Sequence, residues 1–318
     1  GTPGLTEANK ILKVGALTYT FSDEMVGSDE IREVRVSDAI LGVAGFFRAS
    51  GNFAFHQSST TLTPSDEVDV QADLLTVGAS DLDIFAGLNG GTANAVGLSL
   101  TGASFALALM SDRNDTERKW KALKAGAEAV EILGIPDVTV SGSNLAVAIN
   151  SKALDGSVID FTKNDVKIAT GVDEEVTLDF KGALIQASGA FDINISEFFR
   201  VSGEFAFKKS TDIVTLADTK GDADPANDVM TETPVDLLTV GGVGVSAFAG
   251  LNAGKAEALG LNLTDTGFAL VLAADQQNAQ RHWMSLKAES GAVAFVGMEG
   301  LTVGADTVRV EINKGYTE

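Results

Sequence analysis

The sequence contains no cysteine and only two histidines, two tryptophans and two tyrosines among 318 residues. Without cysteine, neither a disulfide nor a thiolate metal site can form. The two histidines, His56 and His282, cannot be combined with other residues into a Ser-His-Asp arrangement or a zinc-ligand spacing, and no phosphate-binding glycine loop is present. The sequence therefore predicts no catalytic residues and a protein that is not an enzyme.

Long apolar runs and clustered positive charge are also missing. No run approaches the roughly 18 apolar residues of a membrane-spanning helix, so we expect no membrane span. The formal net charge of −21 argues against a nucleic-acid partner and against docking on anionic lipid, because both need clustered Lys and Arg. With 45% hydrophobic residues, the chain is too apolar to be disordered and can bury a substantial core.

What the sequence does contain is a long tandem repeat. Three landmarks recur at a constant displacement of 163 residues: the motif DLLTVG (Asp73 and Asp236), the motif FAGLN (Phe85 and Phe248) and a tryptophan shortly before LK (Trp120 and Trp283). The motif FFRASGNFAF at Phe46–Phe55 recurs as FFRVSGEFAF at Phe198–Phe207, a displacement of 152. These displacements predict two units, residues 1–155 and 156–318. The 11 extra residues of the second unit fall in the polar stretch Ser210–Pro234, which we expect to be a surface loop.

Period two dominates the apolar pattern, and no helical period persists over a helix-length window. Leu17–Phe21 and its partner in the second unit, Val176–Phe180, alternate as strands do. Ala122–Val130 and its copy Ser285–Val293 contain helix-compatible residues, but the copy includes a glycine and we predict both as strands. The sequence therefore predicts an all-β chain.

A second pattern recurs inside the strands: the alternation of apolar residues is interrupted, and the apolar residues on the two sides of the interruption are five residues apart. Examples are Val77/Leu82 and Leu100/Phe105 and their copies Val240/Val245 and Leu263/Phe268. An odd spacing keeps both side chains on one face only if the strand takes up an extra residue in a bulge. Successive spacings lie at equal distances on the two sides of a predicted turn such as Asn89–Thr92. The bulges of neighbouring antiparallel strands therefore align and form a crease across the sheet. We predict a long creased antiparallel meander in two tandem units, forming an elongated half-pipe, flattened tube or sandwich. The alternative is a β-solenoid, in which the odd spacing is a corner between parallel strands.

One candidate metal site lies in the inserted stretch. Asp222, Asp224 and Asp228 fall at positions 1, 3 and 7 of a calcium-type loop. The bidentate acid expected at position 12 is missing, because Thr233 stands there. The sequence thus leaves two interpretations, a Ca²⁺ site and a solvated acidic loop.

Trp120 and Trp283 occupy equivalent strand starts, each just after basic residues. One interpretation is an aromatic platform for a ligand. The other is a large ring that closes the open end of the sheet, with a neighbouring cation stacked on it, and this second interpretation is the one we favour.

The apolar β patterns LTVGASDLDIFAGLN, GLSLTGASFALALM, LKAGAEAVEILGIPDVTVSGSNLAVAIN and VTLDFKGALIQASGAFDINI carry a family resemblance. They resemble tandem repeats of very large bacterial secreted or surface proteins, some with calcium-binding segments of the RTX kind. The resemblance implies an extracellular or cell-surface location and a stalk, filament or matrix role.

These observations lead to a structural function with two alternatives. The first and last strands correspond to the edges that the two units present to each other, so we expect copies of the chain or adjacent repeats to pair head to tail through sheet edges. One alternative is a binding module whose curved apolar trough takes lipid-like ligands. The other is a glycan-binding adhesin that uses Trp120 and Trp283.

Overall fold

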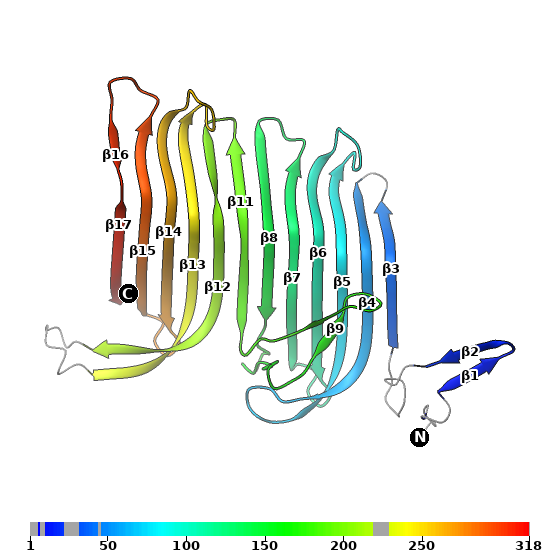
Figure 1. Cartoon of the computed structure of the whole chain (residues 1–318). Coiled ribbons are helices and arrows are strands. Elements are labelled where there is room, and N and C mark those ends of the chain that lie inside the picture. The colour runs from blue at the N-terminus through cyan, green and yellow to red at the C-terminus, as the bar shows by residue number, and fades with distance from the viewer. Residues whose placement is uncertain (1–5, 7–9, 22–31, 44–45, 219–228, 318) are drawn as a thin grey trace.

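The computed structural model describes residue 6 and residues 10–21, 32–43, 46–218 and 229–317. Every regular element in this part of the chain is a β-strand (Figure 1), and every strand pairing is antiparallel. The all-β prediction is therefore confirmed, including the strands at Ala122–Val130 and Ser285–Val293. Antiparallel pairing throughout excludes the solenoid.

One large meander sheet holds most of the strands and stays open, with β3 at one edge and β16 and β17 at the other. The first unit contributes β3 (Arg32–Val43), β4 (Phe47–Leu62), β5 (Val70–Leu88), β6 (Val96–Asp112), β7 (Lys119–Leu133) and β8 (Val138–Asn150). The second unit contributes β11 (Leu184–Ile195), β12 (Phe199–Asp218), β13 (Val229–Leu251), β14 (Leu259–Asp275), β15 (Arg281–Val296), β16 (Val303–Ala305) and β17 (Val308–Thr317). Because β8 pairs with β11, the sheet crosses the predicted unit boundary without a break.

Bulges lie across the middle of this sheet, where the odd spacings predicted them. The pairing of β5 with β6 shifts register between Ala79 and Leu82, and that of β13 with β14 shifts between Gly242 and Val245. In six strands the backbone turns left-handed in this zone, at Asp38, Asp81, Gly102, Asn144, Gly244 and Asp265. A left-handed residue in each of these strands is the backbone signature of a bulge, and their alignment confirms the predicted crease.

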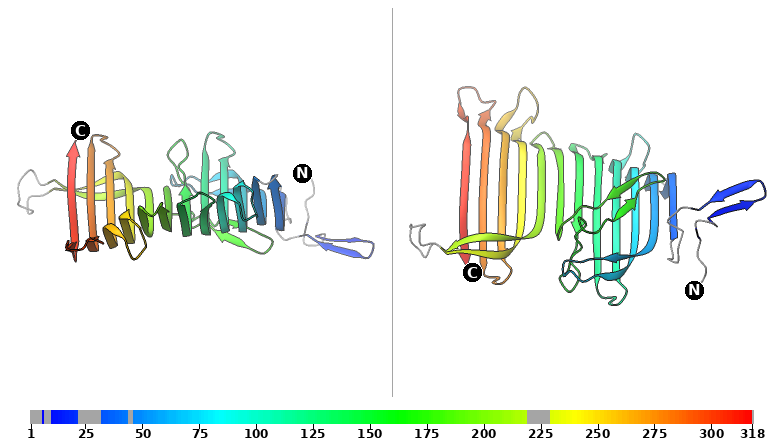
Figure 2. Two further views of the ribbon diagram at one scale, coloured as in Figure 1. Left: turned by 90° about the horizontal axis from the view of Figure 1, so that it is seen from above. Right: turned by 60° about the horizontal axis from the view of Figure 1, so that its bottom comes forward.

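Two short hairpins lie outside the large sheet. β1 (Ile11–Val14) pairs with β2 (Leu17–Thr20) before the first unit, and β9 (Lys167–Ala169) pairs with β10 (Glu175–Thr177) between the units. The β1–β2 hairpin lies beyond the β3 edge in every view (Figures 1 and 2). The β9–β10 hairpin instead lies against the sheet of the first unit. We call residues 151–183, which connect β8 to β11 and include this hairpin, the cover segment.

The main hydrophobic core is formed between the cover segment and one face of the first unit. The sheet contributes the buried residues Leu62, Val70, Ala72, Leu74, Ala106, Ala108, Met110, Trp120 and Ala122. The cover segment contributes the buried residues Ala153, Ile159, Phe161, Val166, Ile168, Leu178 and Phe180. The rings of Phe161 and Phe180 meet edge to face, with centroids 6.1 Å apart. A second, smaller cluster lies at the crease around Ala79, Leu82, Ala103 and Ala127.

The prediction of a surface loop over Ser210–Pro234 is wrong for most of that stretch. β12 and β13 pair continuously from Thr211 with Asp236 to Asp218 with Val229, so the inserted residues lengthen a hairpin. The β-branched residues of this stretch favour extended backbone, which the polar composition concealed. The end of the hairpin bends out of the sheet at the lower left of Figure 1.

Candidate functional site

A buried asparagine ties the cover segment to the sheet. Asn150, the last residue of β8, donates through Nδ2 to the carbonyl oxygens of Ile159 (2.9 Å) and Gly182 (3.1 Å). Asn164 makes a second tie, because it accepts from the backbone N–H of Thr63 (2.8 Å) and donates to its carbonyl oxygen (3.0 Å). Buried amides that satisfy backbone groups in this way fix the position of a segment rather than only its hydrophobic contact.

The start of the cover segment closes over Trp120. The indole Nε1 donates to Ser157 Oγ (3.2 Å), and the guanidinium carbon of Arg118 lies 5.0 Å from the ring centroid. Arg118 also forms ion pairs with Asp66 and with Asp155, the latter at 2.7 Å between Nε and Oδ2. Hydrogen bonds from the Ser157 hydroxyl (2.6 Å) and N–H (2.9 Å), together with Arg118, hold the pKa of Asp155 below its ordinary value.

The β9–β10 hairpin approaches the sheet closely. Its inner side chains Val166, Ile168 and Leu178 are at most 5% exposed. Below it, β5 has a glycine: a Cβ on Gly78 would lie 2.1 Å from the carbonyl oxygen of Ala169. A residue without a side chain is therefore required at position 78, because the backbone of the hairpin occupies that space.

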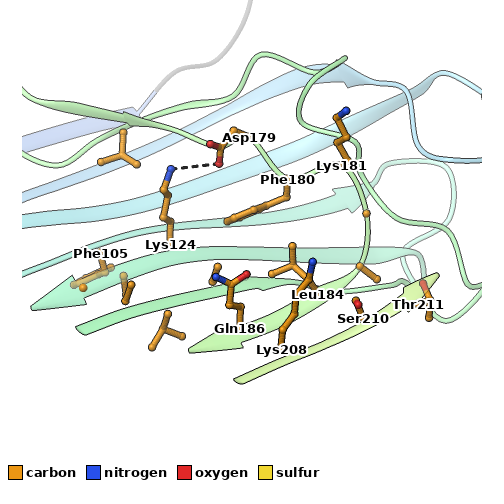
Figure 3. A pocket seen from close by; sticks show the side chains of 18 of the residues that line it. Phe105, Lys124, Asp179, Phe180, Lys181, Leu184, Gln186, Lys208, Ser210 and Thr211 are labelled. Carbon is orange, nitrogen blue, oxygen red and sulfur yellow. Dashed lines mark hydrogen bonds and ion pairs between the residues drawn. The ribbon is translucent and has the colours of Figure 1, made fainter. Parts of the chain in front are cut away.

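A groove of about 940 Å³ opens beside the cover segment, above the junction of the two units (Figure 3). Lys124 reaches from β7 to Asp179 on the cover segment, with 3.3 Å between Nζ and Oδ1. Phe180 lies above the floor of the groove, and Lys181 and Lys208 line it from the cover segment and from β12. Apolar and cationic side chains thus occur together, an arrangement that suits a molecule with an apolar body and an acidic group.

The corresponding face of the second unit has no cover within the described residues. Displacement by 163 residues relates buried Ala106 to Ala269, which is exposed, and fully buried Trp120 to Trp283, which is half-buried. Gly78 corresponds to Gly241, where the nearest atom to an added Cβ would be 3.5 Å away. Next to the β14–β15 turn, this face is as buried as in the first unit: Asp275 is 5% exposed, like its counterpart Asp112.

The two sheet edges expose apolar side chains. On β3, whose described pairing is with β4 alone, Val34, Ile40 and Leu41 are 58–72% exposed. On the opposite edge, Val308, Val310, Ile312 and Val303 are also exposed. Edge strands of soluble proteins are usually protected by charge, proline or a covering element. Both edges combine their exposed apolar side chains with charge: β3 carries Arg32, Glu33, Arg35 and Asp38, and β17 carries Arg309, Glu311 and Lys314. Glu33 and Arg35 form an ion pair at 2.7 Å on β3.

The candidate residues of the sequence are placed as follows. The predicted stacking of a cation on each tryptophan is confirmed, because Arg281 lies 5.2 Å from the centroid of Trp283 just as Arg118 lies over Trp120. An external ligand reaches the ring of Trp120 only if the cover segment moves away. The candidate calcium ligands Asp222, Asp224 and Asp228 lie outside the described residues. His56 lies near Glu33, 3.6 Å between Nδ1 and Oε1.

Over the part of the chain that the structure describes, no group of three or more His, Asp or Glu side chains is placed to hold a metal ion. The same residues include no helix long and apolar enough to cross a membrane. No protein-family model, curated protein or solved structure matches the chain.

Proposed function

We propose that the chain is a non-enzymatic structural repeat module of an extracellular filament, stalk or matrix, and that it assembles edge to edge. In this assembly β3 of one copy adds to the β16–β17 edge of another, and one continuous sheet results. The observation that carries the proposal is the junction of β8 with β11, where the two repeat units of the chain are already joined by such a strand pairing.

The free edges are the repeat counterparts of the two strands at that junction. The displacement of 152 places β3 on β11, and the displacement of 163 places β16 and β17 on β8. β3 and β11 share no identical residue at this displacement, so the proposal rests on their equivalent places beside β4 and β12 and not on repeated sequence. Because the two edges differ, the contact is head to tail and propagates unless the rotation between copies closes a ring.

The register of the expected contact follows from the internal one. At the junction, Ala187 pairs with Val147. Ala187 also pairs with Phe207 of β12, and in the first unit the equivalent Phe55 pairs with Val34. β3 has one extra residue at its bulge between Val36 and Ala39, and the pairing of β11 with β12 has no such shift. Before the bulge, Val34 therefore takes the place of Ala187 rather than of Gln186, the residue that the displacement of 152 alone would give. Val310 takes the place of Val147, so the register sets a valine opposite a valine.

The absence of native cysteine makes this register testable by oxidative cross-linking. We expect the double variant Val34→Cys/Val310→Cys to give a ladder of disulfide-linked oligomers on a non-reducing gel, because directly opposed residues of antiparallel strands have Cα atoms about 4.5–5.5 Å apart. The matched control Val147→Cys/Ala187→Cys joins the same positions inside one chain and should cross-link without a change in oligomer size.

An off-register pair, Ile40→Cys/Val310→Cys, measures random collision. If the Val34/Val310 variant gives no more oligomer than this pair at any protein concentration, the edge-to-edge assembly is wrong. Sedimentation of the unmodified chain over the same concentrations measures its self-association independently of cross-linking.

A further inference from the structure

The β1–β2 hairpin is amphipathic and exposes its apolar face. Leu12 pairs with Tyr19 and Val14 with Leu17, so all four side chains lie on one face. Each of them is 48–59% exposed. A two-stranded hairpin of this size is marginally stable alone and normally needs a surface to pack against.

This hairpin is the repeat counterpart of β9–β10. Lys13 pairs with Thr18 in the first hairpin, and Lys167 pairs with Thr177 in the second. With these pairs superposed, the four apolar residues of β1–β2 correspond in order to the inner residues of β9–β10, namely Val166, Ile168, Val176 and Leu178. In β9–β10 this face is packed into the core of the first unit; in β1–β2 it is open.

The second unit offers the matching surface. Its face has the same sheet pairing as the covered face of the first unit and is exposed at Ala269. Gly241 is the decisive residue. Its counterpart Gly78 has to be glycine because the hairpin backbone lies against it, whereas nothing among the described residues requires a glycine at 241. The second unit thus retains the space that a hairpin backbone would occupy.

The chain order agrees with this correspondence. The hairpin β9–β10, which covers the first unit, directly precedes β11, the strand that pairs with β8, and six residues (178–183) connect them. The β1–β2 hairpin directly precedes β3, and eleven residues (21–31) connect them. If β3 pairs with β17 of another copy, this connection is long enough to bring β1–β2 over the neighbour's second unit.

We propose that the β1–β2 hairpin of one copy docks on the uncovered face of the second unit of another copy, over Gly241, and serves as the cover that β9–β10 provides within the chain. The inference rests on the proposed edge-to-edge assembly and names a second contact within it. Each copy would then donate both an edge strand and a cover to the next.

Site-specific photocross-linking in the full chain tests the contact. Tyr19 is replaced by p-benzoylphenylalanine in a mixture of ¹⁴N- and ¹⁵N-labelled chains, and cross-linked peptides are identified by mass spectrometry. We expect mixed-label pairs that join position 19 to peptides of β13, β14 or β15. The same probe at Thr18, which lies on the outer face of the hairpin, should give at least tenfold fewer such pairs. Equal yields from the two positions, or pairs confined to one label, would overturn the docking.

Two substitutions separate this contact from the edge contact. Gly241→Val fills the proposed docking space, and an added Cβ has ordinary van der Waals room in the single chain, so the variant should fold. It should lose most of the Tyr19 cross-links and weaken self-association by tenfold or more, as should Tyr19→Asp, whereas Thr18→Asp should not. If the Val34/Val310 cysteine pair still forms oligomers while Gly241→Val and Tyr19→Asp change nothing, the hairpin docking fails and the edge assembly stands. If the cysteine pair gives no oligomers, the proposed function itself has failed.

Discussion

The two units build the same sheet and differ in what lies on it. In the first unit, the cover segment buries one face and creates the main core, which includes the fully buried Trp120. In the second unit, the corresponding strands carry Trp283, Gly241 and Asn313, and none of the described residues covers the corresponding face. The comparison shows that a glycine needed under the hairpin of the first unit persists in the second, where the described part of the chain supplies no such hairpin. An exposed apolar face of this kind marks an interaction surface in soluble proteins.

The tryptophans should give the largest contrast. Trp120→Ala removes a fully buried ring together with its bond to Ser157, and we expect a loss of about 4 kcal/mol in the free energy of unfolding. Trp283→Ala removes a half-buried ring and should cost about 1–2 kcal/mol. Urea denaturation of both variants measures the difference. Similar losses would mean that the second unit is covered in solution or that the first is not.

The glycines should give the next largest contrast. Gly78→Ala places a Cβ 2.1 Å from the Ala169 carbonyl oxygen, so β9 has to move, at a cost of about 2 kcal/mol. Gly241→Ala meets no atom closer than 3.5 Å and should leave the stability of the monomer within about 0.5 kcal/mol. Thermal unfolding at a concentration too low for self-association makes the comparison. A tolerated Gly78→Ala would contradict the close approach of the hairpin.

Acid should weaken the attachment of the cover segment to the first unit, with a smaller effect on stability than the Trp120 and Gly78 substitutions. Hydrogen bonds from Ser157 hold the pKa of Asp155 below its ordinary value of 3.8, and the Thr162 hydroxyl (2.6 Å) does the same for Asp160. A carboxyl whose pKa is lower in the folded state contributes stability above its unfolded pKa and loses it as the pH falls through the folded pKa. The stabilisation from both aspartates is therefore complete above about pH 4 and declines progressively below it. Asp155 acts partly through Arg118, outside the cover segment, whereas Asp160 acts through Thr162 within the cover segment.

This effect is measured with one tryptophan at a time. In a Trp283→Phe background, the fluorescence of Trp120 should shift to longer wavelength as the pH falls from 5 to 2, and Asp155→Asn should remove part of the shift. In a Trp120→Phe background, Trp283 reports the face of the second unit, which none of the described residues covers. A shift of the same size and midpoint there would show that acid acts on the whole sheet and not on the cover.

Local pattern predicted the sheet but not its cover. The odd spacing at Val77/Leu82 predicted a bulge because the face of a strand residue depends only on its neighbours, and the register shift lies there. Val176–Phe180 alternates whether it joins the large sheet or packs across it, so its position depends on contacts distant in sequence. One signal did exist: its displacement from Leu17–Phe21 is 159, which differs from both displacements of the sheet strands.

In the candidate site too, local pattern predicted contacts between near neighbours in sequence but not contacts with the cover segment. The cation over each tryptophan follows from the spacing of two residues, which places both side chains on one side of an extended chain, although Arg118 itself just precedes β7. The burial of Trp120 requires Ser157 and the rest of the cover segment, and no local pattern indicates that these residues return to it. The inserted stretch shows the opposite error, since its polar composition hid β-branched residues that extend β12 and β13.

The pairing of β8 with β11 also determines how an array would respond to tension. Ladder hydrogen bonds run across the strands, so a pull between the two edges loads every ladder in series, and the weakest ladder opens first. Most opened ladders remain tethered by a short turn, but the ladder between β8 and β11 is bridged by the whole cover segment. Asn150 shortens this tether, because it is bonded directly to the carbonyl oxygens of Ile159 and Gly182. Until these hydrogen bonds break, the residues between Asn150 and Gly182 carry no tension. Under force, each unit junction would thus release the length of the cover segment only after the bonds of Asn150 and the core contacts of the cover segment have broken.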